Sequence, residues 1–255
     1  MKMAFFESLL VALSTYSAIL VPQFEWNDRN MKYAICFFPA VGILCGGALY
    51  LWYTFCQMLG VSGVVFAAVA TGLPLLITGG IHMDGFMDTV DALASHQSRE
   101  RKLEILKDSH LGAFAAIYCG VYLLTSFGLL YELYSQGNVK LLCLVYVLSR
   151  TLSAFCAVNL PNARKSGMLN AYTKDAVKRT IARTMLILNV VCCGALVVMN
   201  SVIGAIAAIA ANFSMLIYRK ITMKQFGGVT GDTSGFFLQI CELSALAGIW
   251  LGGLL

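Results

Sequence analysis

The stretch Tyr33–Leu59, YAICFFPAVGILCGGALYLWYTFCQML, decides the fold class of this 255-residue chain. It contains no Lys, Arg, Asp, Glu or His. A run of about 20 apolar residues is long enough to cross the hydrocarbon core of a bilayer as an α-helix. A helix that lacks a polar face has no side to present to water. We therefore expect this segment to be a membrane span.

Similar apolar runs recur along the chain. The run at 4–21 is interrupted by Glu7 and ends at Pro22, with no cleavage signal after it. We expect an uncleaved first helix there, which either spans the membrane or lies in its interface. The pattern predicts an all-α, polytopic membrane bundle of about seven or eight helices, forming a single catalytic domain over 1–255. The further spans are expected near 61–81, 111–134, 140–160, 184–199, 202–218 and 234–254.

The composition supports a membrane protein. Hydrophobic residues make up 59% of the chain and charged residues 12%, whereas soluble domains are about one quarter charged. The nine cysteines lie in apolar runs without a CxxC spacing, so we expect neither a structural disulfide nor a zinc site. Basic residues at a membrane surface account for the net charge of +5, and we expect contact with lipid but none with nucleic acid.

The basic residues predict an orientation. Because Lys and Arg favour the cytoplasmic side of a membrane protein, the face that carries them is expected to be cytoplasmic. Alternating spans place all four of the basic segments on one face. These segments lie near 22–32, 82–110, 161–183 and 219–233.

An acidic stripe follows the span that ends near Ile81. The stretch 78–91 reads TGGIHMDGFMDTVD, and its three aspartates, Asp84, Asp88 and Asp91, share one face of a helix. Carboxylates so close repel one another unless a cation lies between them, and their oxygens suit Mg²⁺ or Mn²⁺. A solvated first turn of a helix explains one or two of the aspartates but not three, so we expect a Mg²⁺ site. For His82, a ligand or proton carrier and an ordinary interfacial histidine both stay open.

A second polar element, KDSHLG at 107–112, closes the same loop. Asp108 and Ser109 can cap the next helix. Alternatively, Asp108 joins the acidic stripe and Lys107 faces a phosphate. The amphipathic segment between, 99–107, is expected to be a solvated helix.

Two more elements suit phosphate. The stretch 227–235, GGVTGDTSG, offers close backbone approach and N–H donors, although no Lys follows as in a P-loop. The alternative is a turn into the last span, but Asp232 at the membrane edge needs a partner. In PNARKSG, at 161–167, Arg164 either clamps a phosphate or anchors the loop to the membrane surface. Arg150 and Glu242 lie inside spans, where each needs a partner that the sequence does not identify.

These elements together resemble the cobalamin synthase (adenosylcobinamide-GDP ribazoletransferase) family. The family patterns T-G-G-x-H-x-D-G-x-x-D-x-x-D, K-D-S-x-x-G, P-x-A-R-x-x-G and G-G-x-T-G-D-x-x-G occur in the same order, followed by Glu242. The resemblance spans nearly the whole chain. Two departures are His110, where the family commonly has arginine, and Phe236, where a small residue is usual.

The resemblance implies a Mg²⁺-dependent transferase that joins adenosylcobinamide-GDP to α-ribazole, or to its 5′-phosphate, and releases GMP late in adenosylcobalamin synthesis. It implies a multi-pass protein of the bacterial cytoplasmic (inner) membrane with a cytoplasmic active site. A homo-oligomer and a complex with other corrinoid-pathway enzymes both stay open. Our hypothesis assigns Asp84, Asp88 and Asp91 to the metal. The catalytic set is Asp84, Asp88, Asp108 and Asp232, and the substrate-binding set is His82, Lys107, Ser109, Arg164, Thr230 and Gly231.

Two other functions share parts of this residue pattern. A CDP-alcohol-type phosphotransferase also places spaced aspartates at a membrane surface, but here Asp88 stands where an alanine belongs and the second half of that pattern is missing. A transporter is expected to hold its site near the midplane of the membrane in broken helices, whereas most polar residues of this chain lie in loops.

Overall fold

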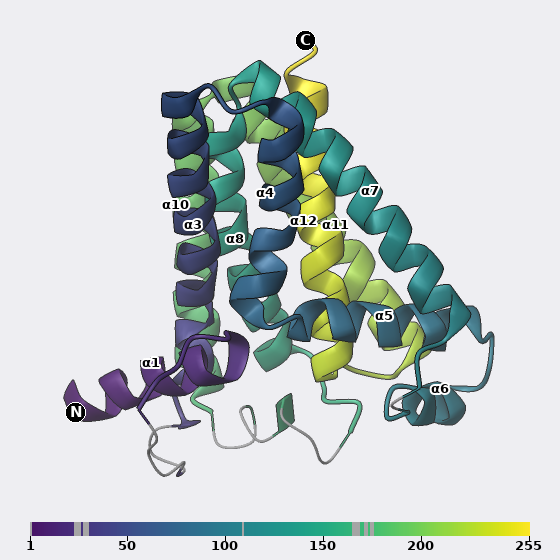
Figure 1. Ribbon diagram of the computed structural model, residues 1–255. Coiled ribbons are helices and arrows are strands. Elements are labelled where there is room, and N and C mark those ends of the chain that lie inside the picture. The colour runs from purple at the N-terminus through teal and green to yellow at the C-terminus, as the bar shows by residue number, and fades with distance from the viewer. Residues whose placement is uncertain are drawn as a thin grey trace.

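The structure, a computed structural model, describes residues 2–22, 27, 31–108, 110–164, 169–170, 173 and 176–255. It confirms the predicted all-α membrane bundle (Figure 1). The helices are α1 (Lys2–Tyr16), the short 3₁₀ helix η1 (Ala34–Phe37), α3 (Phe38–Leu59), α4 (Gly63–Thr78), α5 (Ile81–Ala94), α6 (Arg99–Ile105), α7 (Ala113–Gln136), α8 (Val139–Asn159), α10 (Lys178–Met199), α11 (Ser201–Gln225) and α12 (Gly231–Gly252).

Six helical segments in the described part of the chain are long and apolar enough to cross a membrane. They are η1 with α3, and then α7, α8, α10, α11 and α12. The spans α8 and α12 are buried most deeply in the bundle, whereas α7 is largely exposed. The first helix, α1, lies across one end of the bundle (Figure 1). Of the two interpretations of this helix, the structure therefore favours the interfacial one.

The pair α4 and α5 is bent by 94°. Two consecutive glycines, Gly79 and Gly80, make the bend with φ angles of +61° and +78°, a conformation that side chains with a Cβ adopt at a cost. As a result α4 runs along the bundle, while α5 leaves the spans and lies across the end of the molecule (Figure 1). The predicted span at 61–81 thus ends at this bend. The acidic stripe belongs to α5, a separate helix at the end of the bundle.

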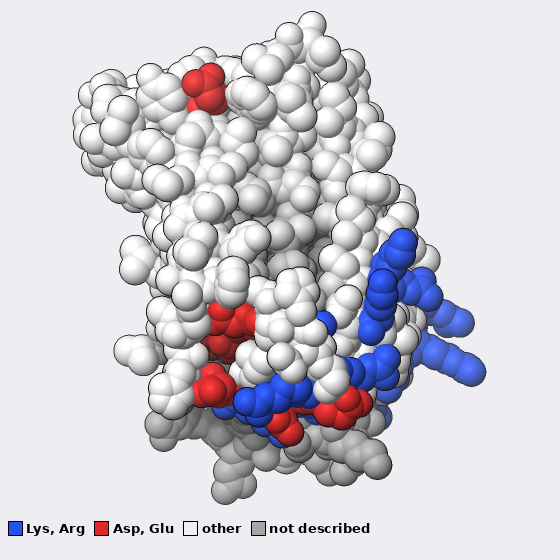
Figure 2. Space-filling view, turned by 90° about the vertical axis from the view of Figure 1, so that its right-hand side faces the viewer, with Lys and Arg blue, Asp and Glu red and all other residues white. Residues whose placement is uncertain are grey.

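The charged side chains gather at this same end. Figure 2 shows Lys, Arg and most acidic residues of one face clustered there, with a broad uncharged surface next to them. The described parts of the loops that join α5 to α7, α8 to α10 and α11 to α12 all lie at that end (Figure 1). The described parts of three of the four basic segments are therefore on one face, as predicted. Most of the fourth, 22–32, lies outside the described residues.

Close contact between α5 and α12 depends on two glycines. A Cβ at Gly85 would lie 2.8 Å from the Cα of Asp232, and a Cβ at Gly235 would lie 2.8 Å from the carbonyl oxygen of His82. Any larger residue would force the two helices apart. The contact brings the acidic face of α5 to the first turn of α12. Beside it, Phe236 stacks on Phe86 with 5.8 Å between ring centroids, so this departure from the family pattern serves helix packing.

The two charges inside the spans are partners. The guanidinium of Arg150 in α8 donates to the carboxylate of Glu242 in α12, and both side chains are buried. Ser149 Oγ donates to the same carboxylate at 2.9 Å, and the guanidinium lies 5.5 Å from the ring centroid of Tyr146. This pair satisfies both charges within the bundle, so neither is required to line a transport path.

Candidate active site

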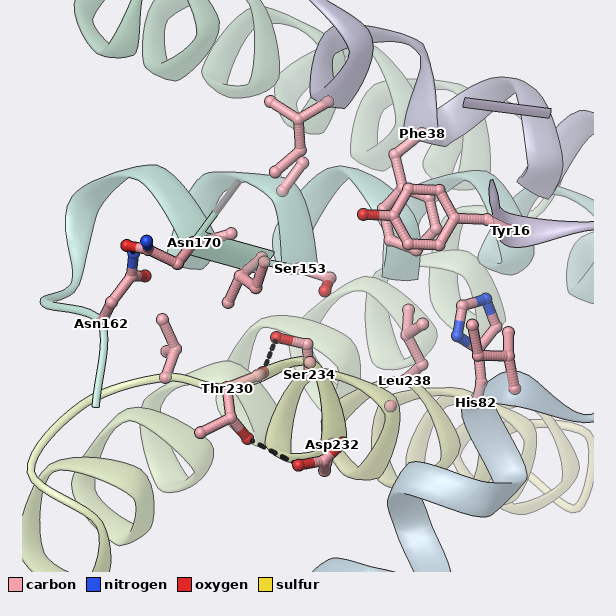
Figure 3. A pocket seen from close by; sticks show the side chains of 18 of the residues that line it. Tyr16, Phe38, His82, Ser153, Asn162, Asn170, Thr230, Asp232, Ser234 and Leu238 are labelled. Atoms are coloured by element: carbon pink, nitrogen blue, oxygen red, sulfur yellow. Dashed lines mark hydrogen bonds between the residues drawn. The ribbon is translucent and has the colours of Figure 1, made fainter. Parts of the chain in front are cut away.

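A cavity of about 280 Å³ opens at the charged end of the bundle. Residues from α1, α3, α5, α8 and α12 line it, together with the loop after α8 (Figure 3). Three separate sequence elements meet here. Of the predicted site residues, the cavity lining includes His82, Asp84, Arg164, Thr230, Gly231 and Asp232.

Backbone pairing joins the loop after α8 to the glycine-rich loop before α12. The Val229 N–H donates to the Pro161 carbonyl at 2.8 Å, and the Ala163 N–H donates to the Val229 carbonyl at 2.9 Å. Gly228 is needed at this point because a Cβ there would overlap the carbonyl oxygen of Pro161. The pairing carries Arg164 to the start of α12.

The first turn of α12 is strongly capped. Thr230 Oγ1 accepts from the Thr233 N–H at 3.1 Å, and Thr233 Oγ1 accepts from the Thr230 N–H at 2.9 Å, which completes a capping box. One carboxylate oxygen of Asp232 accepts from Thr230 Oγ1 at 3.4 Å (Figure 3). The positive end of the helix dipole, which favours anions, therefore faces the cavity.

Arg164 is held in place from two sides. Its Nη2 donates to the Leu103 carbonyl at 2.8 Å, and its Nη1 donates to Asp232 at 3.4 Å. Its Nε is buried without a hydrogen-bond partner in the described part of the protein. The bond to Leu103 shows that α6, expected only to be a solvated helix, also positions this guanidinium.

The carboxylates of α5 and α12 lie close enough for their charges to affect one another. Burial and, to a smaller extent, the charges of Asp84, Asp232 and Asp91 together raise the pKa of Asp88 to about 7, while Arg164 partly opposes them. Such mutual repulsion is the expected signature of acidic groups that face one another without a cation.

Asp91 has a structural task in addition. One of its carboxylate oxygens accepts from the Gly112 N–H and the other from the Ala115 N–H, each at 2.8 Å. The side chain thus caps the N-terminus of α7, and a Cβ at Gly112 would overlap the carboxylate. Each oxygen keeps a second lone pair, so the metal role of Asp91 stays a prediction.

Comparison with known proteins identifies the family. The model of the cobalamin-5-phosphate synthase family matches residues 8–250. The chain belongs to this family. Relatives named adenosylcobinamide-GDP ribazoletransferase include those of Lachnoclostridium phytofermentans (40% identical, covering 95% of this chain and 93% of the relative), Desulfitobacterium hafniense (33%, 94% and 95%) and Clostridium botulinum (31%, 94% and 96%). No solved structure matches the chain at a significant level.

The resemblance to the cobalamin-5-phosphate synthase family implies Mg²⁺. The arrangement of the carboxylates shows which kind of Mg²⁺ site they suit. Within the described residues, no group of three His, Cys, Asp or Glu side chains is arranged to hold a metal ion. Mg²⁺ is usually held by one or two carboxylates, with substrate phosphates and water completing its shell. The converging carboxylates of this site therefore fit an ion shared with a phosphate-bearing substrate, and do not fit a cage made by the protein alone.

Four described residues of the predicted site do not line the cavity, namely Asp88, Asp91, Lys107 and Asp108. Asp108 and Lys107 are exposed, and neither lines the cavity. The Asp108 carboxylate lies 2.6 Å from Nδ1 of His110, and this hydrogen bond lowers the pKa of Asp108. Their catalytic and substrate roles stay predictions, while Ser109 lies outside the described residues.

Several residues that line the cavity were missed in the sequence. Asn162 lay within a recognised element, and its amide donates to Asn170 at 3.0 Å. Tyr16 and Phe38 sit in apolar runs, where no local signal separates a cavity residue from one that faces lipid. The missed residues include Tyr16, Phe38, Ser153, Asn162, Asn170 and Ser234.

Asp88→Asn is expected to raise the thermal stability of the protein in EDTA at pH 8, and to raise it less at pH 5. The folded-state pKa of about 7 lies above the ordinary value of 3.8, so the ionised carboxylate increasingly destabilises the fold as pH rises from about 4 to 7. Thermal unfolding in detergent measures the difference. Adding MgCl₂ at pH 8 should remove most of the advantage.

The control for this prediction is Glu104→Gln, which removes an exposed carboxylate of α6 and should have little effect at either pH. An equal gain for Asp88→Asn at pH 5 and pH 8 would contradict the assignment of a repelling, half-buried carboxylate.

Proposed function

We propose that this protein, a multi-pass membrane transferase of cobalamin synthesis, catalyses the reaction that names its relatives. It transfers the cobinamide phosphate of adenosylcobinamide-GDP to α-ribazole, or to α-ribazole 5′-phosphate, and releases GMP. The observation that carries the proposal is the family match over residues 8–250. The cavity supports it, because a guanidinium, a helix N-terminus and the carboxylates of Asp84 and Asp232 meet there.

The reaction needs a nucleophile, a leaving group and a proton acceptor. A ribose hydroxyl of the acceptor attacks the phosphorus that carries cobinamide, and the bond from that phosphorus to the bridging oxygen breaks. GMP leaves with this oxygen and the bonding electrons, while the hydroxyl proton passes to a base. Asp232 is our candidate for that base because it lines the cavity, whereas Asp108 is exposed to solvent.

The substrate phosphates would be held by Arg164 and by the backbone N–H of Gly231 at the start of α12. The bond from Arg164 to Leu103 fixes the guanidinium before substrate arrives, which limits the entropy lost in orienting it. Thr230 keeps the first turn of α12 intact as its N-cap. These side chains therefore place the pyrophosphate beside the carboxylates of α5.

We propose that Asp84 and Asp88 hold Mg²⁺ together with the substrate phosphates. When bound, the ion supplies positive charge that neutralises the pyrophosphate and stabilises the departing GMP. Asp91 then serves chiefly to tie α5 to the start of α7. This arrangement makes the protein a Mg²⁺-dependent phosphotransferase.

We also propose that the charged end of the bundle faces the cytoplasm, with the protein in the bacterial cytoplasmic membrane. The support is the gathering of Lys and Arg at that end (Figure 2), which is the side they favour in membrane proteins. All groups assigned to the reaction then lie on the cytoplasmic side.

A coupling assay tests the proposal. Purified protein in detergent is given adenosylcobinamide-GDP and α-ribazole, or its 5′-phosphate, with and without Mg²⁺. We expect GMP and the joined corrinoid in equal amounts, and only with Mg²⁺. A folded sample that makes no product with either acceptor would overturn the function. Release of GMP without joined corrinoid would show hydrolysis in place of transfer.

A further inference from the structure

The cavity has two ends of different character. Thr230 and Asp232 lie at one side of it, and three rings, Tyr16, Phe38 and His82, lie at the other (Figure 3). The ring centroids of Tyr16 and Phe38 are 4.5 Å apart, and those of Phe38 and His82 are 5.6 Å apart. The rings come from α1, α3 and α5, so three helices converge to build an aromatic end that the phosphate chemistry does not use.

His82 provides a polar group within this apolar end. The residue is only 5% exposed, and its Nε2 has no hydrogen-bond partner among the described residues. A buried polar atom without a partner is costly, and this one belongs to a residue that lines the cavity. A ligand with one complementary ring nitrogen or hydroxyl would satisfy it.

The volume of the cavity favours the smaller of the two substrates. Pockets for drug-sized ligands begin near 300 Å³, and this cavity measures about 280 Å³. A nucleoside is of that scale. A corrin macrocycle with its peripheral amide chains is several times larger, so it must remain at the mouth of the cavity while only its pyrophosphate reaches Arg164.

The chemistry of the aromatic end favours one kind of base. Aromatic side chains stack favourably on the faces of flat bases. Of the other lining residues, Ile35, Ala154 and Ala157 are apolar and Ser153 offers a single hydroxyl, while Asn162 and Asn170 lie on the side away from the rings (Figure 3). Most of the amide and amino edge of a guanine placed among the rings would therefore be left unpaired at a cost. A flat base with apolar edges and a single unsubstituted ring nitrogen has no such polar groups to leave unpaired.

We infer that the cavity binds the acceptor nucleoside, with its flat apolar base among Tyr16, Phe38 and His82 and its ribose toward Asp232. In the tautomer with a proton on Nε2, His82 donates to the free ring nitrogen of the base. This inference rests on the proposed function and adds to it which substrate occupies the cavity and which residues select the base.

Two variants change the size of the cavity in opposite directions. Ala157→Leu fills space from α8, and Leu238→Ala creates space from α12. Because one methylene in a pocket changes selectivity by about 10-fold or more, Ala157→Leu should raise KM for α-ribazole at least about tenfold. It should change KM for adenosylcobinamide-GDP by less than about twofold. Leu238→Ala should improve the relative kcat/KM for a nucleoside whose base has one more fused ring by about tenfold.

The matched control is Ala68→Leu on the exposed surface of α4, which should leave both KM values unchanged. Thermal unfolding checks that each variant is folded, and if Ala157→Leu does not fold, Leu238→Ala decides. A rise in KM for adenosylcobinamide-GDP alone, or unchanged base selectivity in Leu238→Ala, would overturn the inference.

Calorimetry separates this inference from the proposed function. If the wild-type protein shows no turnover, α-ribazole binding that is lost in Ala157→Leu would still support the assignment of the cavity. Absence of α-ribazole binding to the folded wild-type protein would overturn it.

Discussion

Asp84→Asn is expected to lower kcat by about 10³-fold or more while the protein remains folded. Asp84 lies on the exposed side of α5 and lines the cavity, and asparagine keeps its shape but removes its charge. A bound divalent ion supplies several kcal/mol of charge stabilisation in the transition state, and about 4 kcal/mol corresponds to 10³ in rate. GMP release at saturating Mg²⁺ measures the loss.

The control for this experiment is again Glu104→Gln, which should retain nearly full turnover because Glu104 pairs with Arg101 on the exposed surface of α6. Thermal unfolding must show that Asp84→Asn is as stable as the wild type. Turnover close to normal in this variant would remove Asp84 from the metal site.

Glu242→Leu is expected to destabilise the protein by about 3–5 kcal/mol, the typical effect of removing one partner of a buried ion pair. Arg150 would then be left as an unpaired charge in the centre of the bundle, where it is only 1% exposed. The free energy of unfolding in mixed detergent measures this effect. The site chemistry is not touched directly, since neither residue lines the cavity.

The double variant Arg150→Met/Glu242→Leu is the matched control. It replaces both charges with apolar groups of similar size, a change that is often neutral or stabilising. Most of the lost stability should therefore return. A double variant as unstable as Glu242→Leu would show that Glu242 acts through Ser149 more than through Arg150.

The sequence was sufficient for six of the predicted spans, which follow from the length of their apolar runs. It was also sufficient for the face of α5 that carries Asp84 and Asp88, which follows from helical periodicity. It also marked Arg164 and Asp232 as candidates, although not that they meet. Their contact depends on the pairing of Pro161 with Val229, which joins loops far apart in the chain.

The missed features share a physical cause. Hydropathy ranks Tyr16 and Phe38 as apolar whether they face lipid, a neighbouring helix or a cavity. Asp91 shares a helical face with Asp84, and only the position of α7 shows that its oxygens bind the Gly112 and Ala115 N–H groups. The pairing of Arg150 with Glu242 likewise follows from how α8 packs on α12, which no local pattern encodes.

The contact between Gly85 and Gly235 also affects when the protein becomes active during its synthesis. The acidic face of α5 leaves the ribosome early, whereas Asp232 and the helix that presses against Gly85 come from the last span. A nascent chain that ends before Gly231 carries Asp84 and Arg164 but lacks Asp232 and the helix N-terminus of the proposed phosphate site. We therefore expect activity to begin only when this helix has inserted, and failure of that insertion to leave no partly active form.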